Sequence, residues 1–264
     1  MSFVISKKVK YSIYALVQVV LLYFFSFVAG ELRLYFLVGS LLFCVLGGVL
    51  IHLPINSFKL TLPVILLHIH AVIGALLSLV FFPNLSKLVV VGALGALFVI
   101  TYAIALMNNI FLVVQQKNEL IPLYRVAVTW SQILIVVVCI PYFAGIFKVP
   151  IISVFQSLII SGSTFLFSVY TFWSQRFDED SKVFKIGDVL IGSFLVSFVV
   201  FSLSISVSFI PTESFLLAMF DASILMSGIG YLQAHLKNKI TNRFVFEYSL
   251  VTVLFLLLLL VFKP

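Results

Sequence analysis

Apolar residues fill this chain in long, nearly uninterrupted stretches that are separated by short polar links. Each stretch holds about nineteen to twenty-seven residues, and a helix of about 20 apolar residues crosses a hydrocarbon core of about 30 Å. The pattern predicts an all-α, polytopic transmembrane helical bundle of about nine spans, with eight as the alternative. The predicted spans are residues 11–29, 34–53, 60–82, 88–114, 126–147, 151–173, 189–210, 215–236 and 244–262.

The amino-acid composition excludes a water-soluble core. Of the 264 residues, 63% are hydrophobic and 9% are charged, whereas soluble domains carry about 25% charged residues. The net charge of +7 does not indicate nucleic-acid binding, because the Lys and Arg residues are scattered between apolar stretches. The composition therefore predicts the lipid bilayer as a partner and gives no support to nucleic acid.

The distribution of positive charge predicts which span ends face the cytoplasm. With the N-terminus inside, about twelve Lys and Arg residues fall in inner segments and about four in outer segments, as the positive-inside rule requires. No link is long enough to fold separately, so residues 1–264 are expected to form a single transmembrane domain. The loop-poor architecture favours the cytoplasmic membrane of a prokaryote.

Hydroxyl side chains form stripes along two of the predicted helices. On both spans they recur mainly at three- and four-residue spacing, which places them on one helix face. Small hydroxyl residues let helices approach closely and bond across the interface or to the backbone. The stripes therefore indicate helix packing first, with the lining of a hydrated path as the alternative. The candidate lining residues are Ser157, Ser161, Thr164, Ser168, Ser197 and Ser204.

Ionisable residues inside predicted spans are costly in lipid and therefore mark candidate functional positions. Asp221 shares one side of span 215–236 with Tyr231 and His235. An unpaired carboxylate deep in a span costs about 2.5–3.5 kcal/mol, so Asp221 is expected to face the bundle interior. His235 lies near the cytoplasmic end of the span, where interfacial water is an alternative partner.

Two earlier spans also carry polar side chains within the membrane. His68 and His70 on span 60–82 point about 200° apart, so they cannot chelate one ion as a close pair. Each histidine is a candidate for a structural hydrogen bond or for proton or ligand handling. Asn108 on span 88–114 is expected to bond across helices, with pocket lining as its functional alternative.

Two local patterns favour structural interpretations. Gly92 and Ala96 have the spacing of a small-residue contact between neighbouring helices. Asp178, Glu179 and Asp180 form an acidic run in the longest link. A solvated turn is expected there, because no metal-ligand spacing such as the EF-hand pattern is present.

Motifs for nucleotide, zinc or acyl-transfer chemistry do not occur in this sequence. No cofactor and no metal ion are therefore expected, and the protein is expected not to be an enzyme.

Three functions are compatible with the sequence. A small transporter or permease-like bundle is favoured, because interior His and Asp residues accompany hydroxyl-rich helices. The sequence specifies no small-molecule ligand for it. The alternative is a non-catalytic subunit, sensor or scaffold that packs against a partner membrane protein, and a homo-oligomer is also compatible with the apolar surfaces. An intramembrane lipid-modifying enzyme is the least favoured, because few residues near one interface could form a catalytic pair.

Overall fold

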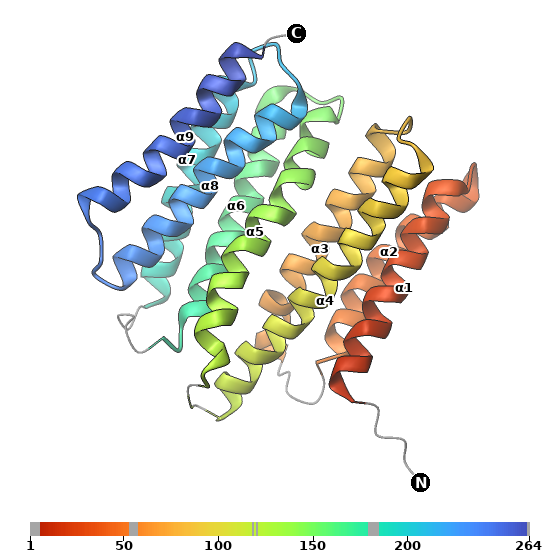
Figure 1. The fold of residues 1–264 in the computed structure, drawn as a ribbon, viewed down its shortest axis with the longest axis horizontal. Helices are drawn as coiled ribbons and strands as arrows, with labels where there is room; N and C mark the ends of the chain where they lie inside the picture. The colour runs from red at the N-terminus through yellow and green to blue at the C-terminus, as the bar shows by residue number, and fades with distance from the viewer. Residues whose placement is uncertain (1–5, 53–57, 118, 120, 179–184, 263–264) are drawn as a thin grey trace. The chain divides into compact units, whose positions relative to one another are not determined.

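The computed structural model describes residues 6–52, 58–117, 119, 121–178 and 185–262. These residues form nine helices and no strand, which confirms the predicted all-α fold (Figure 1). The helices are α1 (Lys7–Phe27), α2 (Glu31–Leu50), α3 (Phe58–Phe81), α4 (Lys87–Lys117), α5 (Leu123–Lys148), α6 (Ser153–Gln175), α7 (Ile186–Val207), α8 (Ser214–Leu236) and α9 (Asn242–Val261).

All nine helices are long and apolar enough to cross a membrane, which makes the chain a multi-pass integral membrane protein in architecture. Every predicted span is present, with ends that differ from the prediction by a few residues. The helix α1, for example, begins at Lys7, before its apolar stretch begins at Tyr11. A helix continues past the apolar stretch because lysine side chains reach interfacial water while the backbone stays hydrogen-bonded.

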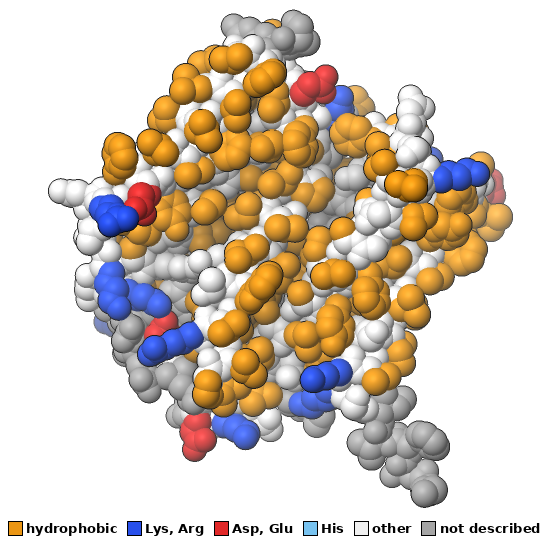
Figure 2. Space-filling model, viewed as in Figure 1, with side chains coloured by type: hydrophobic (Ala, Val, Ile, Leu, Met, Phe, Trp, Pro, Cys, Tyr) orange, Lys and Arg blue, Asp and Glu red, His pale blue; other side chains and the backbone are white. Residues whose placement is uncertain are grey.

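The surface suits lipid rather than water. Hydrophobic side chains cover most of the face shown in Figure 2, and charged side chains lie mostly towards its margins. Leu88, Ile186 and Phe209 are 83%, 80% and 77% exposed, and Leu259 is the one described residue of α9 that is buried. Contiguous apolar surface of this extent promotes aggregation in water, whereas lipid tails contact it favourably.

The helices group into two compact units, residues 1–127 and residues 128–264. Unit 1 holds α1 to α4 and the first residues of α5, and unit 2 holds the rest of α5 with α6 to α9. The single transmembrane domain expected from the sequence stays a prediction.

In unit 1, α1 packs against α2 and α4, and α3 also packs against these two helices. Asn108 of α4 donates from Nδ2 to the Val64 carbonyl of α3 at 2.8 Å, which is the expected bond between helices. The contact predicted at Gly92 and Ala96 is wrong, because both residues are exposed and a side chain added at Gly92 would meet no atom within 4 Å. The helix instead buries a face that includes Leu94, where a larger side chain makes more van der Waals contacts with its neighbours than glycine or alanine would.

In unit 2, α6 packs against α7, α7 packs against α8, and α8 packs against α9. A hydrogen bond of 3.0 Å between the Ser163 and Tyr142 hydroxyls connects α6 to α5. Gly228 allows α7 and α8 to approach closely, because a Cβ atom at that position would lie 2.5 Å from Val196 Cγ1. A small residue is therefore a requirement of this helix contact.

The ends of the unit 2 helices alternate as an up-and-down threading requires (Figure 1). The link after α6 meets the end of α8, because Asp178 Oδ2 pairs with Lys237 Nζ at 2.7 Å. The link between α7 and α8 meets the end of α9, where Thr212 Oγ1 donates to the Phe262 carbonyl at 3.1 Å. The two links thus lie at opposite ends of the unit.

Candidate functional site

Asp221 is a fully buried carboxylic acid of unit 2. It lies about two turns into α8, and 0% of the residue is exposed. Neither carboxylate oxygen has a hydrogen-bond partner among the described residues. The Ser204 hydroxyl of α7 and the Cys139 thiol of α5 lie close enough to interact with the carboxylate, but Ser204 Oγ completes no hydrogen bond. An ionisable group buried in this way is costly and marks a candidate functional site.

The hydroxyl stripes of α6 and α7 meet at one reciprocal pair. The Oγ atoms of Ser161 and Ser197 are 2.7 Å apart. Ser161 Oγ lies 3.0 Å from the Ser197 carbonyl, and Ser197 Oγ lies 2.9 Å from the Ser161 carbonyl. Each hydroxyl can therefore donate to the opposite helix, which is the packing role expected of small polar residues in lipid.

Other hydroxyl groups of the two stripes are buried without a partner. A hydroxyl inside a helix ordinarily donates to its own backbone one turn earlier, as Thr171 does to the Phe167 carbonyl at 2.9 Å. The unpartnered hydroxyls are those of Ser157, Thr164, Ser168, Ser193 and Ser204, and each of these residues is 0% exposed. Packing does not account for them, whereas water is the usual partner of buried polar groups that the protein leaves unsatisfied.

We call these five residues, together with Gln175 and Asp221, the polar track of unit 2. Both amide atoms of Gln175 at the end of α6 are also buried without a partner. On α6 the track follows spacings of seven, four and seven residues, which hold its members within a narrow arc of the helix. From Ser157 to Gln175 the helix rises about 27 Å, close to the thickness of the hydrocarbon core.

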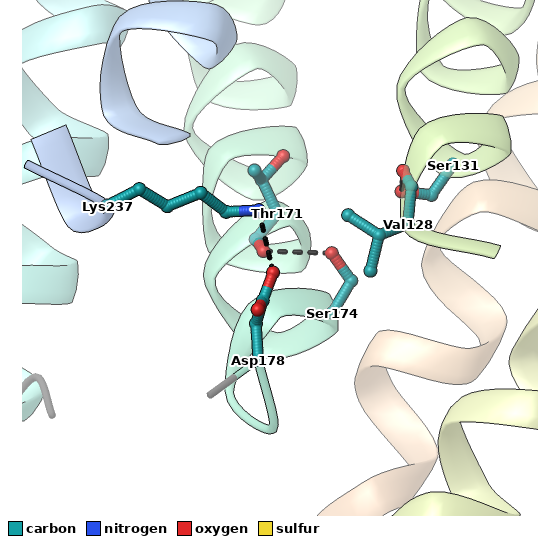
Figure 3. A network of polar contacts seen from close by, with 6 residues as sticks. All are labelled: Val128, Ser131, Thr171, Ser174, Asp178 and Lys237. Carbon is teal, nitrogen blue, oxygen red and sulfur yellow. Dashed lines mark hydrogen bonds and ion pairs between the residues drawn. The ribbon is translucent and has the colours of Figure 1, made fainter. Parts of the chain in front are cut away.

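An ion pair lies at the Gln175 end of the track (Figure 3). Lys237 Nζ contacts Asp178 Oδ2 at 2.7 Å, and Ser174 Oγ donates to the Thr171 carbonyl at 2.9 Å beside it. Asp178 is only 9% exposed, so the solvated turn expected from the sequence is wrong for this residue. Glu179 and Asp180 lie outside the described residues.

Tyr231 and His235 are placed apart from Asp221. Their rings stack 6.3 Å apart, Tyr231 is 50% exposed, and His235 is also exposed. Tyr231 lines a mostly apolar groove between α7, α8 and α9, together with Ser227 and Tyr248. His235 lies about 21 Å along the helix from Asp221. The three residues expected on one side of α8 therefore have different surroundings: Asp221 is buried, whereas Tyr231 and His235 are exposed.

The two histidines of α3 differ in their surroundings. His70 Nδ1 lies 2.8 Å from the Leu66 carbonyl of the same helix, which is a structural hydrogen bond. His68 is 0% exposed, and neither of its ring nitrogens has a hydrogen-bond partner among the residues that the structure describes. Its ring meets the Tyr14 ring edge-on at 5.2 Å. His68 therefore remains available for a ligand, in a different unit from Asp221.

Several buried polar side chains were not among the candidates predicted from the sequence. Gln18 lies inside the first predicted span, where an amide was an available signal. Gln175 falls just outside its predicted span, and the pairing of Asp178 with Lys237 joins segments that are distant in the chain.

No protein-family model, curated protein or solved structure matches this chain. Across the described residues, no group of three or more His, Cys, Asp or Glu side chains is arranged to hold a metal ion.

Proposed function

We propose that the protein is a membrane transporter in which the polar track of unit 2 forms the route and Asp221 binds a proton or a small cation. The observation that carries the proposal is a carboxylate that is 0% exposed and has no hydrogen-bond partner on either oxygen within the described part of the chain. Acidic residues inside spans pair with another group or serve an ion or proton pathway. Because the nearby Ser204 hydroxyl does not complete a hydrogen bond to this carboxylate and no other described side chain does, an exchangeable partner is the explanation we favour.

The hydroxyl groups of the track support the same proposal. A transport route must bind its solute strongly enough to admit it and weakly enough to release it. Neutral hydroxyl groups both donate and accept hydrogen bonds, and five of them are buried here without a protein partner. They are suited to water or to a partly hydrated cation, and they include no fixed positive charge that would repel one.

Proton and cation exchange by the purified protein in liposomes tests this function. A pH gradient is imposed, and Na⁺, K⁺ and small organic cations are added in turn while a trapped dye reports the internal pH. We expect at least one cation to dissipate the gradient in wild-type proteoliposomes. Asp221→Asn removes the charge while keeping the size of the side chain, so it should lower the exchange rate at least tenfold.

Glu213→Gln is the matched control, because Glu213 precedes the same helix and is exposed. It should exchange at the wild-type rate. Full activity in Asp221→Asn, or wild-type proteoliposomes that behave like empty ones with every cation, would contradict the proposal.

A second candidate function is that of a non-catalytic subunit, sensor or scaffold. The observation that favours it is α9, whose apolar side chains other than Leu259 are exposed or half-buried and could cover a partner membrane protein or a second copy. Lipid covers such a helix equally well. A stoichiometric partner after gentle extraction into nanodiscs, together with no exchange activity, would favour this second function.

The transport proposal involves no covalent chemistry, so we propose that the protein is not an enzyme. The positive-inside distribution and the short links lead us to propose residence in the cytoplasmic membrane of a prokaryote.

A further inference from the structure

Four buried polar side chains of unit 1 have no hydrogen-bond partner among the described residues. They are Tyr11 and Gln18 of α1, His52 just after α2, and His68 of α3, with exposures of 1%, 0%, 2% and 0%. The unpartnered atoms are Tyr11 Oη, both amide atoms of Gln18, and both ring nitrogens of each histidine. We call these four residues the histidine cluster. Buried polar atoms are nearly always satisfied, so seven together indicate that something occupies their surroundings.

Ring contacts connect α1 to both histidines of the cluster, and Gln18 lies on α1 one turn after Tyr14. The Tyr11 and His52 rings lie 5.5 Å apart, and the Tyr14 and His68 rings lie 5.2 Å apart. The Tyr14 hydroxyl donates to the Cys44 carbonyl at 3.1 Å, which fixes this ring against α2. His52 and His68 are also close enough to interact electrostatically.

The charge around the cluster is positive. Lys7 lies near enough to His52 to interact with it electrostatically, and its Nζ approaches Asn109 Oδ1 at 3.4 Å. Eight of the 16 Lys and Arg residues but only two of the nine acidic residues fall within residues 1–127. These two, Glu31 and Glu119, are both exposed, so they do not neutralise the buried cluster.

The environment of the histidine cluster argues against a metal ion bound there. A histidine that binds a metal normally donates its second ring N–H to a carbonyl or carboxylate, which orients the ring. Among the described residues, neither ring nitrogen of His52 or of His68 has such a partner, and the nearby lysine repels cations. In contrast, a phenol, an amide and two imidazoles can each donate one or more hydrogen bonds to an anion.

We propose that the histidine cluster binds a small monovalent anion such as chloride. Tyr11 Oη, Gln18 Nε2 and one N–H of each imidazole donate to the ion, and Lys7 balances its charge. Water molecules that accompany the ion satisfy the remaining acceptor atoms. The site belongs to unit 1, so it does not rest on the role proposed for Asp221.

Binding of radioactive chloride to the full-length protein in nanodiscs tests the proposal, with a scintillation proximity readout at constant ionic strength. Wild-type protein should bind chloride saturably, and bromide should displace it whereas gluconate should not. Tyr11→Phe removes one donor and keeps the ring, so the dissociation constant should rise about tenfold or more. Tyr35→Phe is the matched control, because Tyr35 lies in the same unit and is 69% exposed.

Gln18→Leu and His68→Gln test the site independently of any folding defect in one variant, and size-exclusion profiles verify that each variant is folded. Both should also weaken chloride binding. Absence of saturable binding in the wild type would overturn the proposal, as would variants that all bind chloride like the wild type. Tight binding of Zn²⁺ or Cu⁺ that depends on His52 and His68 would assign the cluster to a metal and would overturn it as well.

Discussion

At the scale of single residues, the buried hydroxyl groups of unit 2 are of two kinds. Ser161 and Ser197 bond to each other across α6 and α7, and this bond explains why hydroxyl groups are tolerated in a lipid-embedded contact. Ser168 and Ser193 are also buried, but their hydroxyls have no hydrogen-bond partner among the described residues. The first pair stabilises the contact between helices, whereas the second kind needs a partner from outside the protein.

The reciprocal serine pair should show measurable coupling in unfolding experiments. Ser161→Ala and Ser197→Ala should each lower the free energy of unfolding by about 0.5–1.5 kcal/mol. The double variant should reveal a coupling of about 0.6 kcal/mol, since hydrogen bonds between membrane helices average near that value. Ser202→Ala is the control, because the Ser202 hydroxyl bonds only within α7. Strict additivity of the two single changes would show that the hydroxyls do not act as a pair.

The ion pair of Asp178 and Lys237 should matter more than the exposed pair of Arg243 and Glu247. The Asp178 side chain is 6% exposed, so Lys237→Met leaves a carboxylate in a poorly hydrated place. We expect the free energy of unfolding to fall by about 1–3 kcal/mol. Arg243→Gln should leave it unchanged, because that pair is 88% and 56% exposed. Equal effects of the two substitutions would contradict this interpretation.

Residue types alone could identify Asp221 and the histidines as costly in lipid. They could not show which of these side chains has a hydrogen-bond partner. His68 and His70 are the same residue type two positions apart. One bonds to its own helix and the other has no partner, and this difference depends on which neighbouring helix each side chain meets. The burial of Asp178 was likewise unpredictable, because its partner Lys237 is distant in the chain.

At the scale of helices, the lipid environment makes the position of each helix predictable from the sequence, but it does not make the contacts between helices predictable. Backbone groups in a bilayer must bond within the segment, so an apolar stretch of sufficient length becomes a helix. All nine spans could be predicted from this rule. The contact expected at Gly92 was wrong, because every face of a span is apolar and small residues alone do not show which face meets a neighbour.

The helix contact at Gly228 gives a matched comparison with Gly92. A methyl group at Gly228 would lie 2.5 Å from Val196 Cγ1, whereas one at Gly92 would meet nothing within 4 Å. Gly228→Ala should therefore lower the free energy of unfolding by about 1–3 kcal/mol through overpacking. Gly92→Ala should leave stability unchanged or slightly higher, because alanine favours helix more than glycine does. Thermal unfolding in detergent micelles measures both, and similar midpoints for the two variants would disprove the close α7–α8 approach.

At the scale of the whole molecule, each unit encloses polar groups that its own side chains leave unsatisfied. In unit 1 these groups are a phenol, an amide and two imidazoles beside a lysine, and in unit 2 they are mainly hydroxyls beside a carboxylate. The opposite local charge suits an anion in one unit and a cation or proton in the other. The positive-inside rule gave the threading, and the links near Asp178 and Thr212 do lie at opposite ends of unit 2.

The polar track is the central claim, and access of a small cation to Ser193 tests it most directly. In a Cys44→Ser, Cys139→Ser background, Ser193→Cys and Phe194→Cys place a thiol at the same depth of α7, one on the track and one at a site that is 62% exposed to lipid. After treatment with Ag⁺, unreacted thiols are alkylated in denaturant and counted by mass spectrometry. The account predicts that Ag⁺ protects the thiol at 193 and leaves the thiol at 194 free. Equal and complete alkylation at both positions would contradict it.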